Sequence, residues 1–335
     1  MSENPTVDSV VNWVKAQVGL GGPVKPGPVM SVTPPIAVGV APTTLTLDKP
    51  SDTLTAVGVL PGGTYSWTSS APGVATVTMS SADPTSSKAA VQPVTAGTST
   101  ITVTYTVGGR SASATSIVTV PVRNFIIVFG EPGTAASGHN VGGLFNLAAQ
   151  THLKELKANT PPAAGIPATL PSDTITVSII HTVSDLVSKL SAGNVFYLAY
   201  FGHSWNDTGH VGALDIGQEH VADSNLTIGV NTPGDVAANT APSALPKSAF
   251  LPNAIIFLFG CRCAWGTGSI AEQIHTQLGL TVFGYDNSGG SIFTKDKTLG
   301  HGGRAVTQAD QSAKNISGGD VWMVPWDGTP HFKSF

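Results

Sequence analysis

The sequence predicts a multidomain protein in which an all-β sandwich precedes an α/β domain, whose mostly parallel sheet is flanked by helices. The 335 residues are enough for two domains. Residues 44–121 are rich in Thr, Ser and Val, whereas residues 122–335 mix apolar runs of strand length with helical patterns. We therefore predict a short helix in 1–20, a Pro/Gly-rich linker in 21–43, the sandwich in 44–121 and the α/β domain in 122–335.

Composition narrows the possible partners and locations. The net charge of −4, the pI near 6.1 and the lack of a Lys/Arg cluster argue against nucleic acid as a partner. The sequence contains no stretch of about 18 to 20 apolar residues, so we expect no membrane span. Met1–Asp8 has neither a basic start nor an apolar core, so we expect no signal peptide. We expect a soluble protein, either cytoplasmic or exported by a signal-independent route.

The first predicted element is an N-terminal helix. Five valines between Val7 and Val18 recur at helical spacing, and Gly19 ends the pattern. Such a short helix is too small to stand alone, so we expect it either to dock on the body of the protein or to bind a larger assembly. Repeated Gly and Pro after it predict an extended spacer.

The sandwich is predicted from short strands separated by turns. Leu45 and Leu47 mark one strand, a second runs from Leu54 to Val59, and Pro61-Gly62-Gly63 is a turn. The stretch Tyr65–Val77 with Val94–Val103 resembles the bacterial immunoglobulin-like module of invasin- and intimin-type surface proteins. The resemblance covers most of residues 44–121. It implies that Trp67 fills the core, and that the module serves as a spacer, an adhesion surface or a docking module.

The C-terminal part alternates strands with helices, which predicts a parallel sheet covered on both faces. The predicted strands are 124–130, 174–180, the run ending at His203, the run ending at Cys261, 281–285 and a sixth at 321–324. The predicted helices are 141–157, 183–190 and 269–278.

Two of these strands end in the same way. The run Asn194–Phe201 stops at Gly202 and is followed by His203, and the run Asn253–Phe259 stops at Gly260 and is followed by Cys261. If the strands are parallel neighbours, both side chains emerge at one carboxyl edge of the sheet. A thiol attacks as its thiolate and needs a nearby base near neutral pH. The pattern therefore predicts the cysteine–histidine dyad of a cysteine hydrolase.

The same residues carry a resemblance to the clan of caspases, gingipains, clostripain, separase and CHAT proteases. Phe201–Ser204 resembles its Gly-His motif, Phe259–Arg262 its nucleophile motif, and Ala264–Ile274 the loop and helix that follow. His203 also precedes Cys261 by a number of residues close to that in caspases, where the His lies about 50 residues before the Cys. The resemblance covers residues 123–290 and implies a cysteine endopeptidase.

It also implies roles for single residues. Cys261 would be the nucleophile, His203 the general base, and the backbone N–H groups of Ser204 and Cys261 the oxyanion donors. Ser204 stands where the family usually has Gly. No cofactor is implied. We also expect no metal site, because His210 and His220 with the two cysteines match no standard zinc spacing.

Loops after the strands set specificity in this clan, where an acidic residue selects Arg or Lys. Asp215 and Asp286 are candidates for such a pocket, and His139 could assist substrate binding. For each of the three, a solvated loop side chain is the alternative. Arg262 argues weakly for the opposite specificity.

Three alternatives stay open at this point. Cys263 could be the nucleophile in place of Cys261. The chain could be a non-catalytic structural or adhesive protein of a bacterial surface, phage or secretion assembly, with a silent scaffold. It could also be a peptidase that stays inactive until the long segment Gly209–Pro252 is reshaped.

Overall fold

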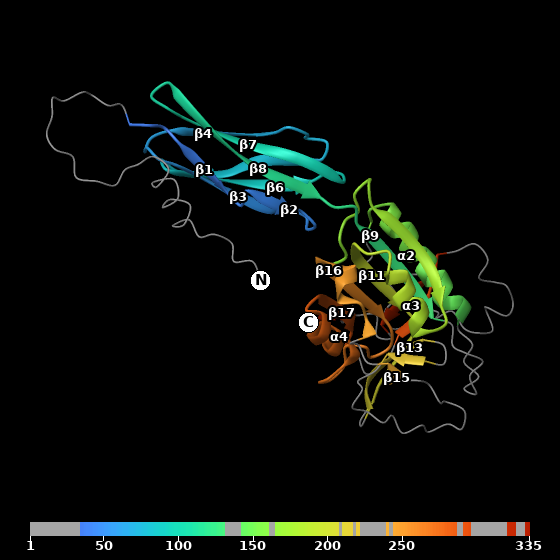
Figure 1. Cartoon of the computed structure of the whole chain (residues 1–335). Helices are drawn as coiled ribbons and strands as arrows, with labels where there is room; N and C mark the ends of the chain where they lie inside the picture. Colours follow the sequence, from blue (N-terminus) through green and yellow to red (C-terminus); the bar gives the residue numbers. More distant parts are fainter. Residues whose placement is uncertain are drawn as a thin grey trace, which may run out of the picture. The chain divides into compact units, whose positions relative to one another are not determined.

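The computed structural model (Figure 1) divides the chain into two compact units, one formed by Met1–Val122 with Leu170–Ser172 and the other by Arg123–Thr169 with Asp173–Phe335. The residues that it describes are 34–130, 142–160, 165–207, 210–216, 219–221, 239–240, 244–286, 291–295, 320–325 and 332–335. The predicted N-terminal helix therefore lies outside the described residues.

The first unit contains two four-stranded sheets. One has the order β1 (Val38–Ala41), β3 (Asp52–Gly58), β6 (Ser86–Pro93) and β5 (Ala75–Ala82). The other has the order β2 (Thr44–Thr46), β8 (Arg110–Val120), β7 (Gly97–Val107) and β4 (Thr64–Ser69). All neighbours are antiparallel except β2 and β8. Strand β1 lies in the range that was predicted to be a linker. The prolines around it indicated an extended spacer, and the short buried Val-Gly-Val pattern was therefore not predicted as a strand.

The core of the first unit forms between these strands through side chains that alternate in and out. Its fully buried members include Leu47, Leu54, Ile101, Val103 and Tyr105. Trp67, expected in the core, is only half-buried against this cluster, and its Nε1 donates a hydrogen bond to Ser87 Oγ at 3.0 Å.

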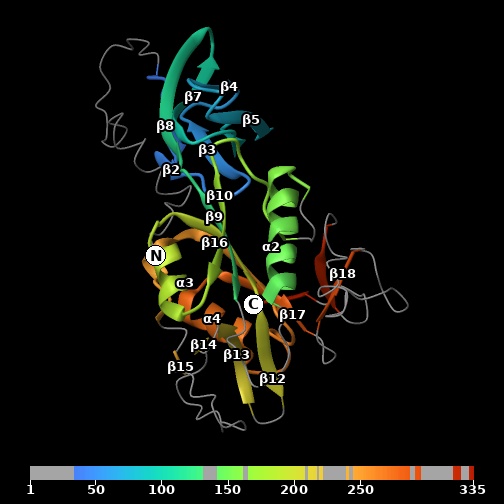
Figure 2. The ribbon, with the colours of Figure 1, turned by 90° about the vertical axis from the view of Figure 1, so that its right-hand side faces the viewer.

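A six-stranded sheet is the centre of the second unit. Its order is β10 (Thr174–Ile180), β9 (Asn124–Gly130), β11 (Val195–Phe201), β16 (Phe250–Phe259), β17 (Thr281–Tyr285) and β20 (Phe332–Ser334). Neighbours are parallel except β17 and β20. Its helices are α2 (Gly142–Lys157), α3 (Val183–Leu190) and α4 (Ile270–Leu278). Figure 2 shows α2 on one side of the sheet and α3 and α4 on the other.

The predicted fold class was nevertheless wrong. The described residues are mostly strand, with three α-helices, and they form several sheets that include antiparallel ones. The second unit contains two sheets that were not predicted. These are β12 (His203–Asp207), β13 (His210–Ile216), β14 (Glu219–Val221) and β15 (Asn239–Thr240) in one, and β18 (Ser291–Thr294) with β19 (Trp322–Pro325) in the other.

These extra sheets escaped prediction for a physical reason. Their strands are short and partly polar, and they fall in Gly- and Asn-rich sequence that usually forms loops. The predicted sixth strand at 321–324 pairs with β18 and not with the central sheet, whose last member is the antiparallel β20. The segment Gly209–Pro252, interpreted as a long insertion, contains β13, β14 and β15.

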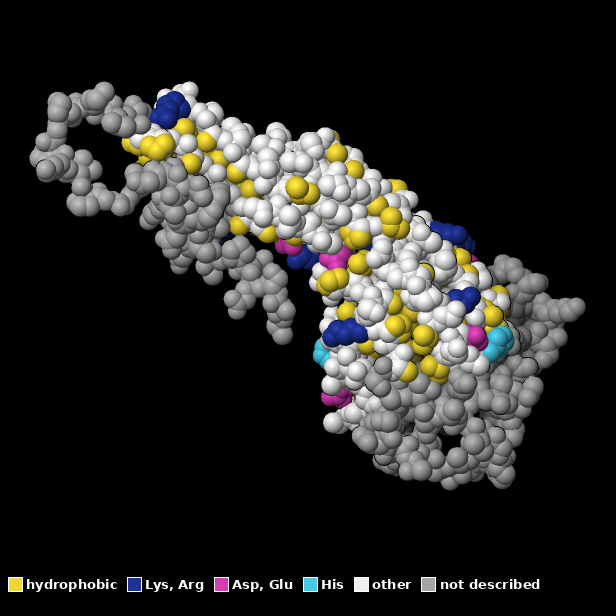
Figure 3. Space-filling model, in the orientation of Figure 1, with side chains coloured by type: hydrophobic (Ala, Val, Ile, Leu, Met, Phe, Trp, Pro, Cys, Tyr) yellow, Lys and Arg dark blue, Asp and Glu magenta, His cyan; other side chains and the backbone are white. Residues whose placement is uncertain are grey.

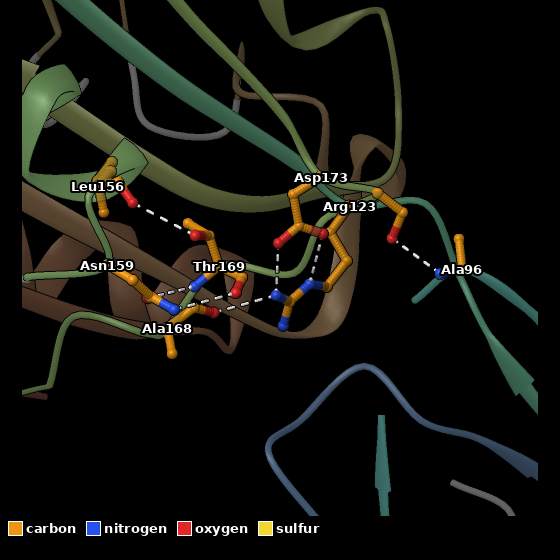
Figure 4. A network of polar contacts seen from close by, with 8 residues as sticks. Ala96, Arg123, Leu156, Asn159, Ala168, Thr169 and Asp173 are labelled. Atoms are coloured by element: carbon orange, nitrogen blue, oxygen red, sulfur yellow. Dashed lines mark hydrogen bonds and ion pairs between the residues drawn. The ribbon is translucent and has the colours of Figure 1, made fainter. Parts of the chain in front are cut away.

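A buried ion pair ties the starts of β9 and β10 together (Figure 4). The Nε of Arg123 donates to Asp173 Oδ1 at 3.0 Å, and its Nη2 donates to Asp173 Oδ2 at 2.5 Å and to the Ala168 carbonyl at 3.0 Å. The guanidinium also lies 4.3 Å from the ring centroid of Phe196. Because a buried charge is tolerated only when it is paired, this clamp fixes the edge of the sheet.

The visible surface offers no large charged area among the described residues. Figure 3 shows Lys, Arg, Asp and Glu side chains as separate small groups on the face in view. Within the same described part of the chain, none of the helices is long and apolar enough to cross a membrane.

Candidate active site

The candidate dyad is positioned by the parallel pair β11 and β16. Phe201 and Phe259 are the last registered partners of these strands, and their rings stack with centroids 4.4 Å apart. Each Phe is followed by Gly and then by the reactive residue, so His203 and Cys261 occupy equivalent places two residues past the pair. Adjacent strands are about 4.8 Å apart, which brings the two positions to one edge of the sheet.

The two glycines before the reactive residues are required by close packing. A Cβ at Gly202 would lie 2.1 Å from Tyr200 Oη. A Cβ at Gly260 would lie 2.6 Å from Ser204 Oγ and 3.2 Å from the Gly202 carbonyl. Only glycine fits at either position without displacing a neighbour.

His203 is held by groups from three elements. It opens β12, where the register pairs it with Asp215 of β13. Its carbonyl accepts a hydrogen bond from Tyr200 Oη at 3.1 Å. The ring of Phe145 in α2 meets the imidazole edge-to-face, with centroids 5.0 Å apart and planes at 86°. The sequence pattern did not single out Phe145, because helical spacing cannot show which distant ring a core residue touches.

Cys261 lies in a turn with a strained neighbour. Its side chain is partly exposed. The next residue, Arg262, has φ +56°, in the left-handed region that residues with a Cβ rarely adopt, and its guanidinium lies 5.5 Å from the Trp265 ring centroid. The hydroxyl of Ser204, a buried side chain, donates a hydrogen bond to the Cys261 carbonyl. The histidine strand and the cysteine turn are therefore in direct contact.

The second cysteine has a different environment. Cys263 is fully buried, with its thiol 3.1 Å from the Leu258 carbonyl and 3.2 Å from the Gly260 carbonyl, and its sulfur accepts the Tyr285 N–H at 3.2 Å. Burial raises the pKa of the Cys263 thiol to about 12. Cys263 is therefore protonated and inaccessible near neutral pH, and Cys261 is the more exposed of the two thiols.

Both ends of the turn after the cysteines are anchored. The N–H of Ala264 donates to the Tyr285 carbonyl, and that of Ala271 to the Cys263 carbonyl, each at 3.0 Å. Ser269 caps α4, and Glu272 Oε2 accepts the Gly268 N–H at 2.7 Å. These contacts fix the backbone that links the cysteine turn to α4 and β17.

The structure does not bring all predicted substrate-binding residues together. Asp215 is the ladder partner of His203, so its position is next to the dyad. Asp286 follows β17, two residues beyond the registered pair Leu258 and Gly284, and is half-buried. His139 lies outside the described residues. No described contact joins Asp286 to either member of the dyad.

No protein-family model and no curated protein matches the chain. Among solved structures, domains 4 and 5 of the S-layer protein SbsC are similar over 25% of this chain and 44% of that chain, with 22% identity and a TM-score of 0.22. A 2,6-sialyltransferase from a Photobacterium species is similar over 49% of this chain and 34% of that one, with 13% identity and a TM-score of 0.18. The chain thus spans less than half of either protein. Scores this low carry no argument about function.

Proposed function

We propose that the chain is a cysteine endopeptidase that hydrolyses peptide bonds through Cys261 and His203, with the first unit as a spacer or docking module. The observation that carries the proposal is the paired register of β11 and β16, together with the hydrogen bond from Ser204 to the Cys261 carbonyl. Both features support a site in which His203 and the partly exposed Cys261 act together at one edge of the sheet.

The chemistry assigns one role to each group. His203 takes the proton of the Cys261 thiol, and the thiolate adds to the carbonyl carbon of the scissile peptide. Backbone N–H groups at Ser204 and Cys261 stabilise the resulting oxyanion. The C–N bond then breaks, and the amine leaves with the proton that His203 returns. Water activated by His203 hydrolyses the thioester and restores the free thiol.

A preference for a basic residue before the scissile bond is part of the proposal. Asp215 is registered opposite His203, and Asp286 follows the strand next to that of Cys261. A carboxylate near the dyad would favour an Arg or Lys side chain by charge complementarity. Peptides with Arg or Lys directly before the scissile bond should therefore be cleaved faster than peptides with Asp at that position.

Labelling with a peptidyl chloromethyl ketone tests the dyad directly. The wild-type chain should bind one equivalent by intact mass, and Cys261→Ala should bind none. His203→Ala should be labelled at least about tenfold more slowly, because its thiol has lost the base. Cys263→Ala is the matched control, since it also removes one thiol, and it should be labelled like the wild type.

Two results would contradict the assignment. Equal labelling of the wild type and Cys261→Ala would show that Cys261 is not the reactive group. Labelling of Cys261 without cleavage of any Arg-, Lys- or Asp-containing peptide library would show a reactive thiol on a non-catalytic scaffold.

A further inference from the structure

We propose that Ser204 is a positioning residue whose hydroxyl holds the nucleophile turn in its reactive conformation. The inference deepens the proposed function and rests on it. The sequence motif assigned Ser204 only a backbone N–H, whereas the structure shows its side chain in contact with the cysteine turn. The Ser204 hydroxyl would act through Cys261 and would not itself touch the substrate, which in the proposed mechanism meets only the backbone N–H of this residue.

The first support is the packing of the Ser204 side chain. Ser204 is the second residue of β12, registered with Leu214, and 6% of its surface is exposed. An ideal Cβ at Gly260 would lie 2.6 Å from Ser204 Oγ and 2.9 Å from Ser204 Cβ. The Ser204 side chain therefore fills the space that the missing Gly260 side chain leaves, and its hydroxyl is confined to the end of β16.

The second support is the group that the hydroxyl binds. The acceptor is the Cys261 carbonyl, which belongs to the peptide between Cys261 and Arg262. Arg262 is in the left-handed conformation, which is unfavourable for an L-residue with a Cβ. Such a conformation persists only when surrounding contacts determine it. The Ser204 hydroxyl provides one such contact at the peptide directly before the strained residue.

These contacts lead to a functional consequence. Rotation of the Cys261–Arg262 peptide would change the ψ torsion of Cys261, and the rotamers that its Sγ can adopt next to His203 depend on the backbone torsions. A donor fixed on β12, the strand that begins with His203, couples the thiol turn to the imidazole. Small errors in the placement of reacting groups are costly to rate, so the hydroxyl should affect reactivity more than it affects stability.

The test measures the rate constant for alkylation of Cys261 by iodoacetamide between pH 5 and 9, together with kcat and KM for a peptide substrate and the melting temperature. Ser204→Ala should lower the alkylation rate constant and kcat about tenfold, with little change in KM, because the Cys261 carbonyl loses a buried donor. Ser191→Ala is the matched control. It removes an exposed hydroxyl that donates to the Ser188 carbonyl at 2.6 Å, and it should leave all these values unchanged.

The outcomes separate this inference from the proposed function. Slower Cys261 alkylation in Ser204→Ala without any peptide cleavage by the wild type would support the positioning role and contradict the peptidase. Peptide cleavage that is equally fast in the wild type and Ser204→Ala would support the peptidase and overturn the positioning role. A lower melting temperature with unchanged rate constants would also overturn it. If Ser204→Ala does not fold, Ser204→Gly, which also removes the hydroxyl, is measured in its place.

Discussion

His152 is a fully buried imidazole directly behind the strand ends that carry the candidate dyad. Its Nε2 lies 2.9 Å from Tyr197 Oη, and its ring contacts Phe201 and Phe259 with centroids 5.5 and 5.2 Å away. Burial lowers the pKa of His152 to about 3. The folded protein therefore holds this ring neutral over the whole physiological range.

The buried neutral imidazole of His152 predicts a pH-dependent stability. Its folded pKa lies below the ordinary value of 6.5, so between pH 6.5 and 3 the unfolded chain binds a proton that the folded chain does not. The free energy of unfolding should fall by about 1.4 kcal/mol per pH unit as pH drops through this range. His152→Gln should be less stable at pH 7 but should lack this slope. Hydrogen exchange of β11 between pH 4.5 and 7.5 measures the free energy.

A control variant separates this effect from general acid sensitivity. His181 is an exposed histidine of the same unit, and His181→Gln should keep the wild-type slope. An unchanged slope in His152→Gln would show that other groups cause the acid sensitivity.

At the scale of elements, the ends of β11 and β16 approach so closely that one added methyl group should separate them. A Cβ at Gly260 meets Ser204 Oγ at 2.6 Å and the Gly202 carbonyl at 3.2 Å, and the backbone carbonyl cannot yield as a flexible side chain could. Gly260→Ala should destabilise the second unit by about 1 to 3 kcal/mol and slow the alkylation of Cys261. Urea unfolding and thiol labelling provide the two measurements.

Gly73→Ala is the matched control for this substitution. Gly73 has nothing within 4 Å of its ideal Cβ, so the change should be within about 0.5 kcal/mol of neutral. If Gly260→Ala were as neutral as Gly73→Ala, the close approach of the two strand ends would be refuted.

The same elements show what the sequence could and could not predict. The bounds of β9 and β10 agree with the predicted strands, because the continuous apolar run of β9 and the alternating polar and apolar residues of β10 leave little ambiguity. The positions of His203 and Cys261 two residues past a registered strand pair could be predicted, because each strand ends in a Phe-Gly pair directly before the reactive residue. The Phe145 and Ser204 contacts could not be predicted, because each depends on a residue at least 57 positions away meeting its partner in three dimensions. The sheet that begins at His203 was missed for the same reason, since its pairing is decided by tertiary contacts and not by periodicity.

At the scale of the whole molecule, the described residues form two separate hydrophobic cores, one in each compact unit. Leu54 is fully buried in the first core and Leu258 is buried in the second. Because each core is built from its own sheets, each unit should unfold as its own cooperative transition, and the reactivity of Cys261 should depend only on the second.

Paired core substitutions test this independence. Leu54→Ala and Leu258→Ala each remove a buried side chain at a cost of about 2 to 5 kcal/mol, which should lower the melting temperature of the affected unit by about 5 to 20 °C. In calorimetry, Leu54→Ala should shift one transition and leave the alkylation rate of Cys261 unchanged, whereas Leu258→Ala should shift the other transition. If Leu54→Ala moved both transitions or slowed the alkylation of Cys261, the two units would be energetically coupled, and the first would contribute to the chemistry as more than a spacer or docking module.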